Sequence, residues 1–441
     1  MENLLIMGIN TRPMVNSALK LKYNTFSVSY FKTLDFIEPF NSKHILHQEL
    51  AIGGAEFNCG SFEENFSSFK LLDLAEEYLD IVDKIIFTTG ISANDFKGKF
   101  SKFKNKIYGN LNTEITNDKF KFYNKIKNKF NVPLTFKPVD VDEVVDIAKQ
   151  YNDNQFILKP LDGSGGVGAF LLNNCTLNDF NKSNFESIIL DSSYLMQEYI
   201  SGVNLSSSVL STNSESKNII NTRLLTGHDF NIKDNFVYFG NILPLTYESF
   251  IKFNPILKDN TYKIDNFNLN LFKNNFDKIN ENMSLVSQDL ISSLDLIGSN
   301  GVDFILSEDS LKSRSSDFDE NDLYVIEVNP RFQGTYECCE DVLGINMLDA
   351  HIKACEGELI EIPKLNNSNL LYSIKKIIYA ENNIEVNDLN ISNVYDIPYK
   401  NVKIEKNQPI VTILNSNSDL DLLIQDLDFA ENKINKNIKF L

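Results

Sequence analysis

The chain contains no tryptophan, and it has only 4 histidines and 5 cysteines among 441 residues. The cysteines are an odd, scattered set without a C-x-x-C pair, so neither a disulfide framework nor a zinc site is supported; they are Cys59, Cys175, Cys338, Cys339 and Cys355. Cys338 and Cys339 have no base near them in the sequence and are interpreted as buried helix residues rather than nucleophiles.

Long apolar runs and an excess of positive charge are also missing. No window approaches the ~20 continuous apolar residues of a membrane span. The 60 acidic and 42 basic residues give a net charge of −18, which would repel a nucleic acid. The lysine-rich run near residues 97–130 is interpreted as a solvated helical face. The start, MENLLIMGIN, fits a first strand better than a signal peptide. We therefore expect a cytoplasmic protein without nucleic-acid or membrane partners.

The first hundred residues alternate between strand and helix patterns, which predicts a parallel sheet; the strands are expected at 4–9, 25–31 and 83–90, and the helices at 11–23 and 69–82. Ligands of such sheets bind beyond the carboxyl ends of the strands, so the loop from Gly8 to Arg12 is a candidate substrate edge. Arg12 is either a substrate contact or an exposed residue at the start of a helix, and the sequence leaves both open.

The remaining chain mixes helices with antiparallel strands. Helical patterns occupy 119–130, 140–151, 283–298 and 419–434. Strand patterns occupy 156–160, 194–200, several segments between 203 and 247, then 301–306, 323–330, 373–380 and 402–414. The acidic, serine-rich stretch 308–322 is predicted to be a surface loop, and residues 364–371 a linker.

A glycine-rich stretch, DGSGGVG, places Gly163, Gly165 and Gly168 in the G-x-G-x-x-G spacing of a dinucleotide site. Such a site requires a helix to begin at the loop, but the apolar run AFLLNNC that follows predicts a strand. A Walker loop fails because no Lys-Ser or Lys-Thr follows the glycines. The pattern instead predicts a β-hairpin whose glycine tip lets backbone N–H groups close over phosphate oxygens.

Two further groups of residues carry chemistry. Lys159 ends a strand that should be buried, and it needs an anionic partner, either a nucleotide phosphate or an internal carboxylate. Farther on, Glu327 and Asn329 share one strand face, and Asp303 on the adjacent strand completes a set of oxygen ligands suited to Mg²⁺. Arg331 continues that period of two, which predicts a positive charge beside the metal.

In combination these motifs resemble the ATP-grasp superfamily, and the surrounding segments resemble the arrangement of its biotin-carboxylase-like members. The motifs are NDKFKFYNKI, ILKP, DGSGGVG, MQEYISG, GVDFIL and VIEVNPRFQGTYE. The resemblance implies an α/β and α+β protein: a Rossmann-like domain at 1–108, an ATP-grasp domain at 109–362 and a small β-rich C-terminal domain at 363–441. The ATP-grasp domain divides into a flap subdomain at 119–200 and a metal subdomain at 201–362.

The resemblance also implies roles for individual residues. ATP would contact the phosphate-binding lysines, the glycine-rich lid and the hinge strand: Lys119, Lys159, Gly163, Ser164, Gly165, Gly166, Val167, Gly168, Gln197, Glu198, Tyr199 and Ile200. One or two Mg²⁺ (or Mn²⁺) ions would bind Asp303, Glu327 and Asn329, and Arg331 would stabilise an acyl phosphate. Family members commonly place an acid after the hinge for the ribose hydroxyls. Asn204 occupies that place here, and an amide can also hydrogen-bond a hydroxyl.

The reaction implied is ATP-dependent ligation, in which a small carboxylate is activated as an acyl phosphate and transferred to an amine, with release of ADP. Glu337 is expected to orient the nucleophile, and His351 is interpreted as a packing residue rather than a substrate contact. A homodimer is expected because dimers are common among relatives. The alternatives are a carboxylase that uses bicarbonate, a regulatory protein that binds ATP without turnover and, more distantly, a nicotinamide oxidoreductase.

Overall fold

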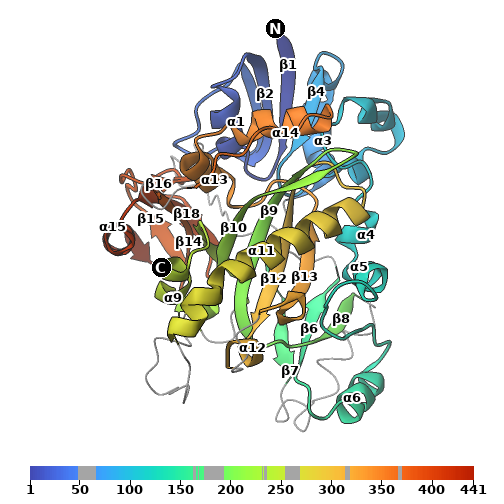
Figure 1. Cartoon of the computed structure of the whole chain (residues 1–441). Coiled ribbons are helices and arrows are strands. Elements are labelled where there is room, and N and C mark those ends of the chain that lie inside the picture. The colour runs from blue at the N-terminus through green and yellow to red at the C-terminus, as the bar shows by residue number, and fades with distance from the viewer. Residues whose placement is uncertain are drawn as a thin grey trace.

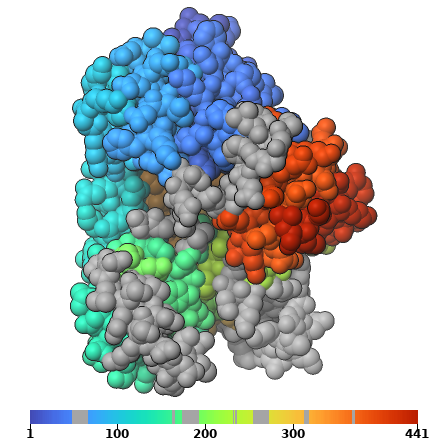
Figure 2. Space-filling view, turned by 180° about the vertical axis from the view of Figure 1, so that it is seen from behind, coloured from blue at the N-terminus to red at the C-terminus, as the bar shows by residue number. Residues whose placement is uncertain are grey.

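A computed structural model of the chain describes residues 1–47, 66–161, 165–166, 168–172, 193–230, 232, 236–253, 269–312, 318–365 and 370–441. In the space-filling view of Figure 2 the N-terminal and C-terminal segments form separate lobes beside the middle of the chain. No helix among the described residues is long and apolar enough to cross a membrane.

The N-terminal lobe is built on a parallel sheet of order β3-β2-β1-β4, which confirms the alternating pattern of the sequence; its strands are β1 (Glu2–Gly8), β2 (Tyr23–Phe31), β3 (Asn41–Leu46) and β4 (Lys84–Phe87). Helix α3 (Ser68–Leu79) packs on one face, against Leu5 and Met7. Helices α1 (Arg12–Ala18) and α14 (Met347–Cys355) pack on the other face, against Leu4 and Ile6. Figure 1 shows α14, from a much later part of the chain, crossing this sheet.

A second sheet, called the flap sheet below, is antiparallel and has the order β5-β8-β6-β7; its strands are β5 (Thr135–Phe136), β6 (Phe156–Pro160), β7 (Phe170–Leu172) and β8 (Tyr194–Glu198). Strands β6 and β7 pair with Phe156 opposite Leu172, so a strand rather than a helix follows the glycines, as predicted. Helix α6 (Val141–Gln150) covers this sheet and begins at Asp140, whose side chain accepts a hydrogen bond from the N–H of Glu143.

The largest sheet has eight strands in the order β13-β12-β9-β10-β11-β14-β18-β16. The strands before residue 330 are β9 (Gly202–Ser211), β10 (Ser216–Thr226), β11 (Tyr238–Leu243), β12 (Gly298–Ser307) and β13 (Leu323–Asn329). Helix α11 (Leu269–Ser293) lies along this sheet (Figure 1) and buries Phe276, Met283 and Leu290 against it, because its apolar residues recur at helical spacing.

The C-terminal segment extends that same sheet with β14 (Tyr372–Tyr379), β16 (Val394–Tyr395) and β18 (Pro409–Asn417), a continuity that the sequence does not predict. It adds a three-stranded sheet of β15 (Ile384–Val386), β17 (Lys403–Ile404) and β19 (Ile438–Phe440), and helix α15 (Leu420–Lys436) packs on its core. The remaining short helices are α4 (Glu114–Asn117), α5 (Lys119–Ile126), α9 (Tyr247–Lys252), α12 (Glu308–Lys312) and α13 (Tyr336–Leu343).

Two local predictions differ from the structure. Residues 308–312 form helix α12 rather than a loop, because Ser307 begins the helix by accepting a hydrogen bond from the N–H of Ser310. In the lysine-rich run, residues 98–106 form a 3₁₀ helix that buries Phe100 and Phe103, so this segment is a half-buried face and not a fully solvated one.

Candidate active site

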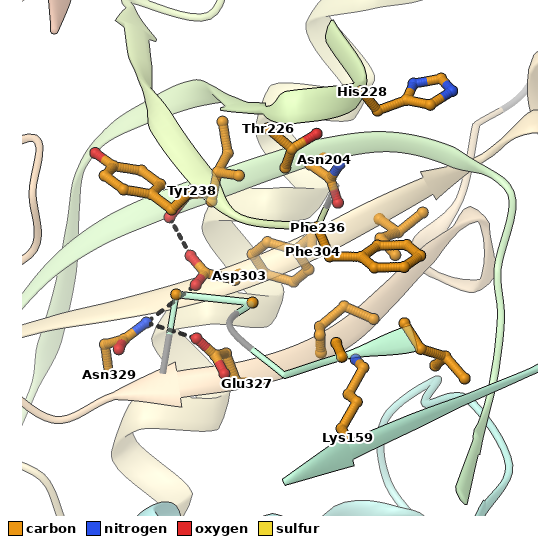
Figure 3. Close-up of a pocket in the computed structure, with 18 of the residues that line it drawn as sticks. Lys159, Asn204, Thr226, His228, Phe236, Tyr238, Asp303, Phe304, Glu327 and Asn329 are labelled. Carbon is orange, nitrogen blue, oxygen red and sulfur yellow. Dashed lines mark hydrogen bonds between the residues drawn. The ribbon is translucent and has the colours of Figure 1, made fainter. Parts of the chain in front are cut away.

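A cavity of about 900 Å³ lies between the flap sheet and the eight-stranded sheet. The flap sheet contributes Lys159 and Gln197, and the eight-stranded sheet contributes Asp303, Glu327 and other polar residues. Figure 3 shows the two carboxylates and Asn329 gathered on one wall, with Lys159 projecting from the other sheet. The predicted phosphate-binding and metal-binding groups therefore share one cavity.

The metal candidates lie side by side because β12 and β13 pair with Asp303 directly opposite Glu327. The side-chain amide of Asn329 donates to Asp303 Oδ2 at 3.0 Å and to Glu327 Oε1 at 3.4 Å. Ser206 Oγ donates to Asp303 Oδ1 at 2.6 Å. Each carboxylate thus keeps an oxygen pointed at its neighbour, and the alternation predicted for β13 places Glu327 and Asn329 on one face as expected.

Burial, followed by the charge of Glu327, raises the pKa of Asp303 to about 7. Two buried carboxylates facing each other repel, and a divalent cation between them would remove that repulsion. The amide oxygen of Asn329 could supply a third oxygen ligand once its side chain turns over. Within the described part of the chain no group of three or more His, Cys, Asp or Glu residues is placed to hold a metal. The oxygen donors of Asp303, Glu327 and Asn329 are of the type that suits a hard ion such as Mg²⁺.

Arg331 lines the same cavity, although β13 ends at Asn329 and the chain turns at Pro330. The prediction that Arg331 continues the strand period is therefore wrong, because its N–H already closes a tight turn onto Asn329 O at 2.8 Å. Burial lowers the pKa of Arg331, while Glu327 and Asp303 oppose that shift. Among the described residues its guanidinium makes one hydrogen bond, to Phe332 O at 3.3 Å. Its other donors have no hydrogen-bond partner in this part of the chain, which is compatible with binding an anion.

Lys159 and Lys119 form the opposite, cationic side of the cavity. Lys159 Nζ donates to Gln197 Oε1 at 2.8 Å, and it makes no ion pair with any carboxylate of the described residues. Burial lowers the pKa of Lys159 to about 8, Glu327 raises it and Lys119 lowers it further. Of the two partners that the sequence leaves open for Lys159, an internal salt bridge is absent among the described residues, and the lysine lines the cavity.

The hinge strand is only partly available to a ligand. The side chain of Glu198 accepts hydrogen bonds from Leu134 N–H at 3.1 Å and Asn154 Nδ2 at 2.6 Å, so it serves the flap sheet. The N–H of Tyr199 donates to Gln155 O. Both residues still line the cavity, and so does Ile200, whose N–H has no partner among the described residues. Among the described residues, the N–H of Ile200, just after β8, is therefore available to a ligand in the cavity.

Asn204 lies in the cavity wall near Thr226 and His228, as Figure 3 shows. Arg223, whose side chain is 2% exposed, pairs with Asp229 and donates to the carbonyl oxygen of Asn204 at 2.6 Å. Asp229 also accepts from the N–H of Thr226 at 2.7 Å. This buried pair fixes the 3₁₀ turn at Gly227–Phe230 and with it the wall that Asn204 belongs to.

The glycine-rich tip reaches the far wall of the cavity. Gly165, Gly166 and Gly168 have φ values of +64°, +77° and +76°, a region that favours glycine. The carbonyl oxygen of Gly165 accepts a hydrogen bond from Tyr238 N–H at 3.0 Å. A Cβ on Gly166 would lie 1.9 Å from the carbonyl oxygen of Phe236. The tip is thus seated on the start of β11. Gly163, Ser164 and Val167 lie outside the described residues.

Arg12 and Glu337 form an ion pair with each other, which the sequence does not predict. Arg12 is 1% exposed and donates to both carboxylate oxygens of Glu337 at 2.8 and 2.9 Å, and to Asp396 at 2.6 Å. Neither Arg12 nor Glu337 lines the cavity. Glu337 is therefore held by an interior ion pair outside this cavity, and Arg12 is buried rather than exposed.

His351 and the adjacent cysteines behave as interior groups, which agrees with their interpretation from sequence. His351 Nδ1 accepts from Ser299 N–H at 2.8 Å, and Nε2 lies 3.0 Å from the carbonyl oxygen of Tyr108. Burial lowers the pKa of His351 to about 4 and raises the pKa of Cys339 to about 12. A neutral imidazole and protonated thiols are the forms expected of side chains that pack in the interior.

Sequence reasoning missed several residues of the cavity wall, namely Phe236, Tyr238, Asn241, Glu308, Gln333 and Lys375. Gln333 had a signal, since it follows Arg331 by two positions in the motif. It accepts from Ser208 Oγ at 2.7 Å and donates to Ser206 Oγ at 2.9 Å, and Ser206 in turn holds Asp303. Lys375 had no signal, because its position depends on β14 joining the large sheet.

Comparison with known proteins supports the resemblance. The model of the ATP-grasp domain family matches residues 116–335. An uncharacterized protein of Methanocaldococcus jannaschii is 29% identical over 416 residues, covering 93% of this chain and 87% of that protein.

Solved structures share the fold over almost the whole chain. Biotin carboxylase of Campylobacter jejuni, in a complex with a βγ-ATP ligand, is 16% identical with a TM-score of 0.67, covering 99% of this chain and 92% of that one. The biotin carboxylase domain of Hydrogenobacter thermophilus 2-oxoglutarate carboxylase, with MgADP and bicarbonate, is 15% identical with a TM-score of 0.66 over 97% and 89%. L-amino acid ligase of Bacillus licheniformis is 13% identical with a TM-score of 0.62 over 100% and 99%.

At these identities the solved structures speak to the fold alone, and they confirm the fold class expected from the sequence. The family model covers the flap, the hinge strand, both metal strands and Arg331. The chain therefore carries an ATP-grasp domain and belongs to the ATP-grasp superfamily.

Proposed function

We propose that the protein is a Mg²⁺-dependent, ADP-forming ligase that activates a carboxylate as an acyl phosphate and transfers the acyl group to an amine. One observation carries the proposal. A cavity of about 900 Å³ holds two lysines on one side and, on the other, a carboxylate pair beside a nearly unbonded arginine. Binding of ATP alone would not need that arginine.

In the proposed complex the nucleotide lies between the two sheets. Lys119 and Lys159 bind its phosphates, the N–H of Ile200 bonds the adenine and Asn204 faces the ribose. Asp303, Glu327 and Asn329 hold Mg²⁺, which supplies charge neutralisation to the β- and γ-phosphates when bound. The seated glycine tip excludes water from above, so that an activated acid is protected from hydrolysis.

The chemistry then needs position and charge more than proton transfer. A carboxylate oxygen of the acid attacks the γ-phosphorus, the new O–P bond forms as the bond to the β–γ bridging oxygen breaks, and ADP leaves. The amine nitrogen attacks the acyl carbon, the C–N bond forms, phosphate departs with the C–O electrons, and the amine proton is lost to solvent. Arg331 lines the cavity near Glu327 and Asp303, which supports a role for it in binding the negative oxygens of the acyl phosphate.

The test is a screen for ADP formation with amino acids, small carboxylates and bicarbonate, each with and without amines. Turnover is expected with an organic acid and an amine together, and Glu327→Ala should abolish it. Glu358→Ala, which removes an exposed carboxylate, should leave it unchanged. Turnover that survived in Glu327→Ala would show that the metal assignment is wrong.

Two other outcomes would replace the proposal. Transfer of label from [¹⁸O]bicarbonate into phosphate would identify a carboxylase that works through carboxyphosphate. Calorimetric binding of Mg-ATP without ADP release for any acid and amine pair would identify a regulatory ATP-binding protein.

A further inference from the structure

Lys375 lines the cavity from β14, a strand of the C-terminal segment that no nucleotide motif includes. Its side chain makes no hydrogen bond or ion pair with any of the described residues, and it is half-buried. The next residue, Lys376, points to the opposite face of the strand and is paired there with Glu431. One of two adjacent lysines is therefore satisfied within the protein, and the one in the cavity is not.

Among the described residues, no carboxylate forms a direct ion pair with Lys375. Lys375 helps to lower the pKa of Asp396. However, Asp396 Oδ1 already accepts from Asn10 Nδ2 at 2.7 Å and from Arg12 Nε at 2.6 Å, and no ion pair joins it to Lys375 within the described part of the chain. The ammonium group of Lys375 therefore has no direct partner among the described residues and is available to an anionic ligand in the cavity.

The place of β14 in the sheet separates Lys375 from the metal-binding pair. The strand order from β12 to β14 is β12-β9-β10-β11-β14, and Figure 1 shows β12 and β14 well apart across the width of the sheet. Four strand spacings of about 4.8 Å put the backbones of Asp303 and Lys375 roughly 19 Å apart on a flat sheet. The charges of Glu327 and Asp303 raise the pKa of Arg331, whereas Lys375 lowers the pKa of Asp396. Arg331 and Lys375 therefore lie in different parts of the cavity and are available to different groups of one ligand.

We propose that Lys375 binds a second anionic group of the acid substrate, so that the preferred substrates are dicarboxylates or acids with a comparable remote anion. This inference rests on the proposed ligase function and adds the substrate class. The carboxylate that is phosphorylated lies beside Arg331, and the remote anion lies beneath β14, where Asn241 stands directly opposite Lys375 in the strand pairing. Asn241 Nδ2 donates one hydrogen bond to Thr222 Oγ1 at 3.0 Å, and Lys375 supplies the positive charge for that anion.

The test compares acids that differ only in the remote group: succinate with butyrate, glutarate with pentanoate and adipate with hexanoate. Initial rates of ADP release give kcat/KM for each acid in wild type, Lys375→Met and Lys375→Arg. Losing a hydrogen bond to a charged group corresponds to about a 10- to 100-fold change. Lys375→Met should lower kcat/KM for the preferred diacid by about that factor and leave the matched monoacid within about twofold. Lys375→Arg should retain most of the preference, and KM for ATP should stay constant.

Several results would overturn the inference. Equal losses for diacid and monoacid would make Lys375 a merely structural residue. A loss that follows a carboxylate on the acceptor, found by comparing β-alanine with propylamine, would assign Lys375 to the amine site. Calorimetry of glutarate with Mg-ADP present tests Lys375 separately from turnover. Glutarate binding that Lys375→Met weakens would uphold the inference even if no acid released ADP, while equal binding to both proteins would refute it.

Discussion

Gly166 offers a direct test of whether the glycine tip must seat on β11. At its φ of +77°, a Cβ added to Gly166 would lie 1.9 Å from Phe236 O, so Gly166→Ala meets backbone, which cannot move aside as a side chain can. Gly165 has a similar φ of +64°, but a Cβ there would meet no atom of the described residues within 4 Å. Both substitutions carry the cost of a left-handed alanine, about 1–2 kcal/mol. Only Gly166→Ala adds overpacking, about 1–3 kcal/mol.

The difference between the two variants isolates seating of the tip. We expect kcat/KM for Mg-ATP to be about 5- to 150-fold lower in Gly166→Ala than in Gly165→Ala. Melting temperatures should match, since the tip contributes little to any core. Steady-state ADP release at varied Mg-ATP measures the ratio. Equal kcat/KM values for the two variants would refute the reasoning, because closure would then not use this contact.

Three further predictions concern buried charge. Lys159 has a pKa of about 8 in the folded protein and 10.5 in the unfolded chain. Between pH 8 and 10.5 the unfolded chain therefore binds more protons, and the free energy of unfolding rises with pH by about 3 kcal/mol. Urea unfolding of Lys159→Met should lack that rise. The pKa of His351 is about 4 when folded against 6.5 unfolded, so stability falls as pH drops from 6.5 to 4, and His351→Gln should flatten this acid limb in the same assay. Arg12→Met removes the arginine that pairs with both Glu337 and Asp396 and should lower the free energy of unfolding by about 3–5 kcal/mol. Glu337→Gln should keep kcat within about threefold, because Glu337 lies outside the cavity.

Each of these three predictions would be contradicted by a specific result. Parallel stability curves for Lys159→Met and wild type above pH 8 would mean that Lys159 is not desolvated in solution. Parallel stability curves for His351→Gln and wild type below pH 6.5 would likewise mean that His351 is not desolvated in solution. A hundredfold loss of kcat in Glu337→Gln, with an unchanged melting temperature, would restore the catalytic role that the sequence suggested for Glu337.

The sequence is sufficient for those parts of the site that depend on local periodicity. Alternation along β13 places Glu327 and Asn329 together, and the apolar run after the glycines distinguishes a hairpin from a nucleotide-binding helix. Both follow from rules that act within a few residues, period two for strands and the need for a helix N-terminus at a dinucleotide loop.

Features that depend on distant pairing could not be predicted. The bidentate contact between Arg12 and Glu337 joins residues that are 325 positions apart in the chain, and nothing in either local sequence marks the other. Lys375 enters the cavity only because β14 pairs with β11, Asn241 opposite Lys375. The period of two places Arg331 on a strand that in fact ends at Asn329, since Pro330 lacks the N–H that another ladder bond would need.

The single hydrogen-bonded sheet from β13 to β16 has a mechanical consequence for selectivity. Asp303 and Lys375 belong to the same sheet, so backbone pairing sets the span between them. Lys159 belongs to the separate flap sheet, and no strand pairing fixes its distance from either residue. We therefore expect the order of preference among acids of different length to be the same with ADP, ATP or no nucleotide bound.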